Sequence, residues 1–170
     1  MSEYINGLAK HAAIGLVAGL VATAATAAFM QLAAKPAGID PQAKDDDGEP
    51  PIGSAQAATR AVDLGAKTLT GEPVPKESKE TATGLFQFAF GGALGAAYGV
   101  AARAFPVLGW GRGALFGTGV FAAFDEVLVP ATGLSGTPDD SPPRNHGFAL
   151  AAHLVFGGVA ETVRRILIRR

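Results

Sequence analysis

The sequence predicts an all-α membrane protein: a polytopic helical bundle of four transmembrane helices, with an additional amphipathic helix in one loop. Three observations lead to this fold class. Apolar residues make up 48% of the chain and charged residues only 17%, against about 25% in typical soluble domains. Four stretches have the composition to cross a bilayer, whose core requires about 20 apolar residues in a helix. Glycines recur at four-residue intervals inside these stretches, as they do in closely packed membrane helices.

The four spans follow one another along a single membrane domain, residues 1–170. They are predicted at residues 12–32, 84–104, 112–130 and 147–168. The first two contain long uncharged runs, whereas the fourth is marginal because it holds histidine, glutamate and arginine. A cleaved signal peptide is the alternative for the first span, but its apolar run exceeds the roughly 7–15 residues of such peptides. A soluble alanine-rich bundle is the alternative for all four, and the uncharged runs favour the membrane.

Basic residues predict how the spans are oriented. With four spans, the N-terminus, the connection between the second and third spans, and the C-terminus share one side. That side carries Lys10, Arg103, Arg112, Arg164, Arg165, Arg169 and Arg170. Because cytoplasmic loops carry an excess of lysine and arginine, we expect both termini in the cytoplasm. Tyr98, Phe105 and Trp110 near the same ends are expected to lie at the membrane interface.

The long first loop, residues 35–83, is then expected outside. It begins with an acidic spacer, residues 40–51, which lacks the ligand spacing of a calcium-binding loop. Residues 54–70 predict an amphipathic helix that Ser54 caps and Gly71 ends. Its apolar stripe is expected to contain Ala55, Ala58, Val62, Ala66 and Leu69. This helix is expected to lie on the membrane surface or over the bundle.

Glycines spaced four residues apart give the first three spans a smooth face each. They are Gly15 and Gly19 in the first span, Gly91, Gly95 and Gly99 in the second, and Gly113 and Gly117 in the third. Missing side chains let helix backbones approach one another closely. The pattern favours helix packing within the chain, and a homo-oligomer interface is the alternative.

Asp125 and Glu126 are unusual because they interrupt the third span close to Pro130. They lie about 6–8 Å below the outer end of that span, at 1.5 Å per residue. His146 begins the fourth span, and His153 follows seven residues later, only about 20° further round a helix. The two imidazoles therefore share a face, and that face reaches the depth of the carboxylates because the fourth span runs the opposite way.

Three interpretations of this acidic and histidine cluster are open. It forms a structural polar network that joins the third and fourth spans, or it handles protons or ions, or it binds a metal such as zinc. Histidine titrates near neutral pH, which suits proton exchange or pH sensing. Near the other end of the fourth span, Glu161 is expected to form a structural ion pair with Arg165 or Arg103. His11 is expected to be an interfacial residue.

Several function classes are excluded by composition. The chain has no cysteine, so it has no disulfide, thiolate metal site or thiol nucleophile. A formal net charge of −1 leaves no basic surplus for binding nucleic acid. Ser135 and Ser141 lie in a loop rich in proline and glycine, without the pattern of a catalytic serine. We therefore expect no enzyme activity and no cofactor.

Two strings near the C-terminus carry a resemblance to a known family. The strings FGTGVFAAFDEVLVPATGLSGTP and HGFALAAHLVFGGVAETVRR resemble the YagU-like family of bacterial inner-membrane proteins. Upstream, ATRAVDLGAKTLTGEPVPKESKETATGLFQFAFGGALGAAYG is similar to that family's loop helix and second span. The resemblance covers most of the chain from about Gly15 onward. It implies a multi-span inner-membrane fold without an assigned enzyme activity, and it supplies no ligand.

Two functions are compatible with these features. The first is a non-enzymatic inner-membrane protein, with the lipid bilayer as its surroundings, whose acidic and histidine cluster handles protons or ions or senses pH. The second is a structural or accessory subunit that packs through its glycine-rich faces against a larger membrane protein complex. Chains covering the glycine faces would favour the accessory subunit, and a cavity that reaches His153 would favour the first function.

Overall fold

Every element in the described part of the chain is a helix. The computed structural model describes residues 2–39, 53–134 and 143–169. The elements are α1 (Ser2–Ala33), α2 (Gly53–Thr70), α3 (Lys76–Ala104), the 3₁₀ helix η1 (Pro106–Gly113), α4 (Ala114–Ala123), the π-helical segment η2 (Phe124–Leu128), α5 (Val129–Ala131) and α6 (Pro143–Ile168). The all-α prediction is confirmed. The acidic spacer, Ser135 and Ser141 lie outside the described residues.

Within this part of the chain, three helical stretches are long and apolar enough to cross a membrane. They are Ile5–Ala33, Lys76–Ala104 and Pro106–Ala131. The last of these joins η1, α4, η2 and α5 into one path. Helix α6 is not among the three, because His146, His153 and Glu161 lower its hydropathy. Four transmembrane helices therefore stay a prediction.

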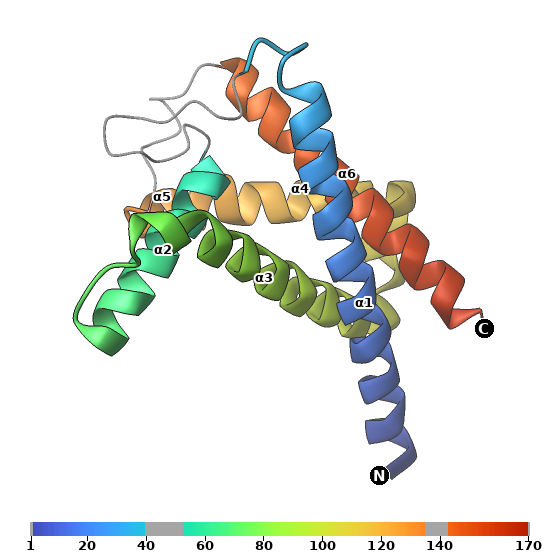
Figure 1. The fold of residues 1–170 in the computed structure, drawn as a ribbon. Coiled ribbons are helices and arrows are strands. Elements are labelled where there is room, and N and C mark those ends of the chain that lie inside the picture. The colour runs from blue at the N-terminus through green and yellow to red at the C-terminus, as the bar shows by residue number, and fades with distance from the viewer. Residues whose placement is uncertain (1, 40–52, 135–142, 170) are drawn as a thin grey trace.

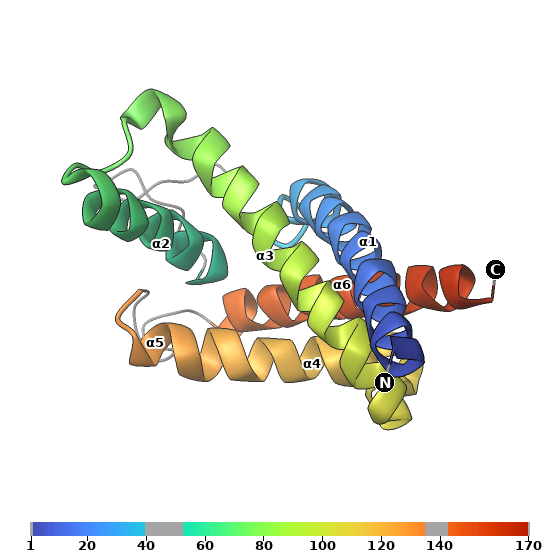
Figure 2. The same cartoon turned by 90° about the horizontal axis from the view of Figure 1, so that it is seen from below.

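The axes of the long helices cross one another at an angle. Helix α1 packs against both α3 and α6, and α4 packs against α6. Figure 1 shows α1 running past α3 and α6, and Figure 2 shows α4 beside α6. The core between them is built mainly from small side chains, with Ala18, Ala22 and Ala160 fully buried. Because alanine and glycine dominate these contacts, the helix backbones approach closely.

Helices α1 and α3 meet backbone to backbone through their glycines. A Cβ placed on Gly15 would overlap the carbonyl oxygen of Gly95, and one placed on Gly19 would overlap that of Gly91. A Cβ on Gly99 would overlap the carbonyl oxygen of His11. As the residue number increases along α1, the residue number of its contact in α3 decreases, so the two helices are antiparallel.

Helices α4 and α6 meet in the same manner. A Cβ on Gly113 would overlap the carbonyl oxygen of Gly157, and one on Gly117 would overlap that of His153. This pair is also antiparallel. Between α1 and α6, Phe29 stacks on Phe148 with ring centroids 5.5 Å apart, while Ala22 lies in a cluster with Ala160. Helix α6 is therefore antiparallel to α1 as well.

The chain reverses direction between α3 and α4 within one short segment. Trp110 is extended, and the next three residues, Gly111, Arg112 and Gly113, all have positive φ angles of 61°, 57° and 92°. Phe105 and Trp110 on this segment are exposed, as interfacial aromatic residues would be. Tyr98 is a correction to the sequence prediction, since only 2% of it is exposed. It is buried because its hydroxyl meets a carboxylate of α6.

Helix α2 lies against α3 and the π-helical segment. It ends where expected, with the Gly71 N–H donating to the Lys67 carbonyl and Gly71 at φ 85°. The predicted stripe is only partly correct: Ala58 is buried, but Leu69 is 86% exposed. The reason is that residues beyond Asp63 extend past the helices that α2 contacts. The side chains of Ser54 and Ala55 lie outside the described part.

Candidate functional site

The two carboxylates of the third predicted span sit on a π-helical turn, Phe124–Leu128. Its closing bond runs from the Val129 N–H to the Phe124 carbonyl, five residues back. Pro130 explains why the helix widens here. In an α-helix the Pro130 ring would clash with the carbonyl of Glu126. Proline also has no backbone N–H that could donate a hydrogen bond to that carbonyl. Single π turns inside α-helices occur frequently at functional sites.

Glu126 forms the outer of two carboxylate–imidazole pairs. Its Oε1 lies 2.9 Å from Nδ1 of His146, on the first turn of α6. The two side chains are 31% and 32% exposed. A hydrogen bond of this kind is strengthened when the imidazole is protonated and the carboxylate ionised. The outer pair is thus a compact group that can exchange protons with its surroundings.

Asp125 forms the inner pair with His153. The distance from Asp125 Oδ2 to His153 Nδ1 is 3.8 Å, and the side chains are only 8% and 16% exposed. Nδ1 of His153 lies 2.9 Å from the carbonyl oxygen of Ala149. Since a carbonyl oxygen only accepts, that nitrogen carries the proton and donates it to Ala149. Asp125 therefore has an ionic contact with the imidazole but not its hydrogen bond.

The second oxygen of the Asp125 carboxylate is also buried. This Oδ1 has no hydrogen-bond partner among the described residues. Buried polar atoms are nearly always satisfied, so this carboxylate oxygen is a candidate acceptor for a proton or for a donor on a ligand. Within the described ranges, the charged groups that face Asp125 are His153, Glu126 and His146. No positively charged lysine or arginine is among these groups.

The predicted residues thus lie together as two pairs at different depths, and their role stays a prediction. Within the described ranges, no group of three or more metal-ligating side chains is arranged to hold a metal ion. The positions of Asp125 and Glu126 on one turn, opposite two histidines on α6, suit stepwise proton binding. The phenyl ring of Phe121 packs edge-on against His153 and keeps the inner pair in apolar surroundings.

A cavity of about 490 Å³ opens beside the inner pair. Helices α1, α2, α3 and α6 contribute to its wall, together with the stretch from α4 to α5. Asp125 and His153 line it, whereas Glu126 and His146 do not. Most of the wall is apolar, with phenylalanine rings from α3, η2 and α6. The two pairs therefore differ in what they touch as well as in how deeply they are buried.

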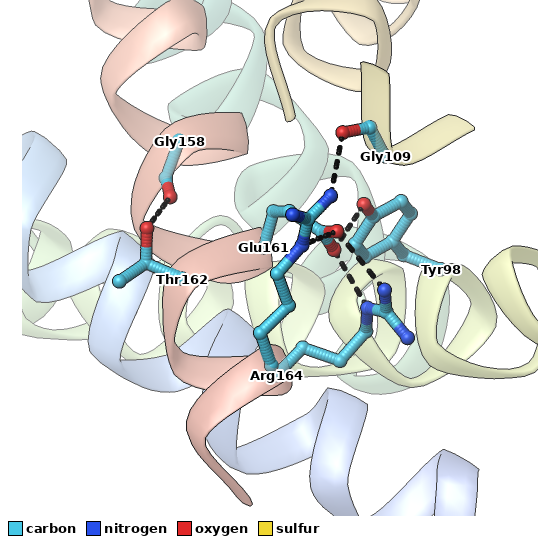
Figure 3. A network of polar contacts seen from close by, with 7 residues as sticks. Tyr98, Gly109, Gly158, Glu161, Thr162 and Arg164 are labelled. Atoms are coloured by element: carbon cyan, nitrogen blue, oxygen red, sulfur yellow. Dashed lines mark hydrogen bonds and ion pairs between the residues drawn. The ribbon is translucent and has the colours of Figure 1, made fainter. Parts of the chain in front are cut away.

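At the other end of α6, Glu161 is the centre of a second network. It is completely buried. The Tyr98 hydroxyl donates to its Oε2 over 2.6 Å, and Arg164 donates from Nε to Oε2 over 2.6 Å and from Nη2 to Oε1 over 3.0 Å. Arg165 donates from Nε to Oε1 over 2.5 Å and from Nη2 to the Gly109 carbonyl over 3.1 Å. Figure 3 shows these groups converging on the carboxylate.

This second network joins α3, η1 and α6. The predicted pair of Glu161 with Arg165 is present. The sequence did not reveal Arg164, whose guanidinium also lies 5.7 Å from the centre of the Tyr98 ring. The guanidinium of Arg103 lies beside Gly7 of α1. Because Tyr98 ties α3 to Glu161 and Arg165 ties η1 to α6 through the Gly109 carbonyl, we interpret this network as structural.

Two further residues remain to be placed. Thr26 was not singled out from the sequence, and His11 was expected to be an interfacial residue. Thr26 lines the cavity, and its hydroxyl is buried without a hydrogen-bond partner in the described part of the chain. A hydroxyl in an otherwise apolar stretch of α1 was the only available signal. His11 lies with Nδ1 3.1 Å from the Gly7 carbonyl oxygen on its own helix, so it is held by a backbone contact.

Comparisons with protein-family models, with curated proteins and with solved structures found no match to this chain. The three apolar helical stretches are compatible with an integral membrane protein.

Proposed function

We propose that this chain is a non-enzymatic, four-span integral protein of the bacterial inner membrane that binds and releases protons and so responds to external pH. The proton-binding groups are the outer pair, Glu126 and His146, and the inner pair, Asp125 and His153. With both termini in the cytoplasm, these pairs lie near the outer face of the membrane. The resemblance to the YagU-like family, which we include in the proposal, supports a location in the bacterial inner membrane.

The observation that carries the proposal is the graded burial of the two pairs. The outer pair is about one-third exposed, while the Asp125 side chain is 8% exposed and one of its oxygens lacks a partner among the described residues. An ionised carboxylate in such surroundings is costly, and protonation removes that cost. A proton taken up at the exposed pair therefore has an acceptor one residue away, at the buried one.

The antiparallel helix contacts support the four-span arrangement. Helix α3 is antiparallel to α1, and α4 is antiparallel to α6, as alternating crossings of a membrane require. The polar groups that lower the hydropathy of α6 are contacted by other helices: His146 by Glu126, and Glu161 by Tyr98. A helix whose polar groups are paired inside a bundle can still cross a bilayer.

The glycine faces do not favour the accessory-subunit alternative. Gly15 and Gly19 lie against Gly91 and Gly95 of the same chain. These smooth faces are therefore already covered without a partner.

Reporter fusions provide a test of the topology. Fusions ending at Ser54 and at Arg170 are separated by three predicted crossings, so we expect them in opposite compartments, with Arg170 in the cytoplasm. An alkaline phosphatase reporter, active only outside, and a fluorescent protein, active only inside, measure this directly. Finding both fusion points on one side would rule out the four-span model.

Proton binding can be followed at the histidines themselves, since the chain has only three. We expect ¹⁵N-histidine NMR in lipid nanodiscs to follow the protonation of His146 as the pH is varied across the range in which histidine usually changes its charge. Glu126→Gln should change the titration of His146, because the imidazolium loses its carboxylate at 2.9 Å. The NMR signals of His11 are an internal control and should be the same in the variant and the wild type at every pH.

The amide of Glu126→Gln still accepts a hydrogen bond, so the fold should be retained. Identical His146 titrations in both proteins would contradict the proposal. The pair would then be a structural contact, and the two adjacent carboxylates would be a solvated feature of the helix end.

A further inference from the structure

The cavity beside the inner pair has the properties of a ligand site. Its volume of about 490 Å³ falls within the roughly 300–1,000 Å³ of pockets that bind small molecules. Apolar side chains from five parts of the chain surround it, including Met30, Leu94 and Phe156. A path for water or inorganic ions would need polar groups along its wall. An apolar wall instead favours an apolar molecule.

Two of the polar atoms on this wall are buried. They are Asp125 Oδ1 and Thr26 Oγ1, and neither has a hydrogen-bond partner among the described residues. The Asp125 side chain is more than nine-tenths buried. A carboxylate only accepts hydrogen bonds, and a hydroxyl accepts as well as donates. Each atom can thus accept a hydrogen bond from a donor located in the cavity.

The charge around Asp125 selects the kind of donor. Its Oδ2 contacts His153 at 3.8 Å, but the Nδ1 proton of His153 is donated to Ala149. The adjacent Glu126 adds negative charge, and His146 pairs with it. When Asp125 is ionised and the histidines are neutral, the site is anionic, and in the described part of the chain no lysine or arginine faces Asp125. A positively charged donor is therefore attracted, and an anionic head group is repelled.

We propose that this cavity binds a lipophilic amine, meaning an amphiphile with one ammonium group and an apolar chain or ring system. The ammonium group donates to Asp125 and Thr26, and the apolar body packs against the phenylalanine side chains of the wall. This inference goes beyond proton binding, with which it shares Asp125. It does not need Glu126 or His146, which are outside the cavity wall.

Dodecylammonium is a suitable probe, and dodecanol and dodecanoate have the same chain with an uncharged or an anionic head. Equilibrium dialysis would compare nanodiscs of zwitterionic phosphatidylcholine with and without the protein, at a pH where histidine is neutral. We expect dodecylammonium to show a saturable component of one equivalent per protein above the empty nanodiscs. Dodecanol should bind at least about tenfold more weakly because a charge-assisted hydrogen bond is stronger than a neutral one, and dodecanoate should not bind saturably.

Two variants locate the probe. Asp125→Asn keeps the shape of the side chain and removes its charge, so the affinity for dodecylammonium should fall at least about tenfold. Ala61→Phe fills the cavity from α2 while all four residues of the two pairs are kept, and should abolish the saturable component. Leu69→Phe, on the same helix and 86% exposed, is the matched control and should bind as the wild type does. If Asp125→Asn does not fold, Ala61→Phe decides the question.

Several results would overturn the ligand inference: no saturable component, equal binding of dodecanol, or unchanged binding in Ala61→Phe. The last would mean that the probe resides in the bilayer or on the protein surface. The two proposals fail separately. If dodecylammonium does not bind saturably but the His146 titration changes in Glu126→Gln, the ligand inference fails and the proton-binding proposal stands. If dodecylammonium binds through Asp125 but the His146 titration is the same in Glu126→Gln, proton binding at the outer pair is refuted and the ligand inference stands.

Discussion

Replacing Gly95 by leucine is expected to destabilise the protein by at least about 3 kcal/mol, the upper end of the usual cost of overpacking a core. A Cβ at this position would overlap the carbonyl oxygen of Gly15 and would lie 2.6 Å from Cα of Gly19. These are backbone atoms of a long helix, so no side chain can rotate away. Helices α1 and α3 would have to separate, which breaks contacts along both.

The matched control is Gly84→Leu on the same helix. A Cβ at Gly84 meets nothing within 4 Å, and leucine is intrinsically better than glycine in a helix by up to about 1 kcal/mol. This control should therefore be neutral or slightly more stable than the wild type. Unfolding titrations with sodium dodecyl sulfate from mild detergent would measure both variants. Equal midpoints for Gly95→Leu and Gly84→Leu would mean that α1 and α3 are not in backbone contact.

The second large effect is expected at Glu161. Replacing it by leucine removes the common acceptor of Tyr98, Arg164 and Arg165. Breaking a buried ion pair by deleting one partner costs about 3–5 kcal/mol, because the remaining charge stays buried. Arg164 bears most of this cost, since its side chain is 13% exposed, whereas that of Arg165 is 50% exposed and can be solvated. We expect a loss near the lower end of that range.

A second substitution separates lost packing from the uncompensated charge. The double variant Glu161→Leu, Arg164→Leu removes both members of the buried pair, so its stability should recover part of the loss in Glu161→Leu alone. Arg165→Gln should have a smaller effect than Glu161→Leu, because its guanidinium is half exposed. The same detergent titration applies. A double variant no more stable than Glu161→Leu would show that the buried charge is not the source of the effect.

Features that depend on neighbouring residues were predictable from the sequence. Hydropathy is a sum over one segment, so the order of residues alone identifies the apolar stretches of α1 and α3. Helical periodicity likewise placed His146 and His153 on one face, at the depth of the carboxylates. The same reasoning did not reveal the π turn at Phe124–Leu128. The adjacent Pro130 was a signal for it, since its ring is incompatible with an undisturbed α-helix.

The sequence by itself therefore determined the helical class, the three most apolar stretches and the residues that interrupt them. The tertiary structure decided which residues meet. Tyr98 looked like an interfacial aromatic residue, but the crossing of α3 and α6 buries its hydroxyl against Glu161. The cavity likewise forms where α1, α2, α3, α6 and the stretch from α4 to α5, which are distant in the sequence, come together. Such contacts depend on the distance and rotation between helices, and neither is encoded in the order of residues along one segment.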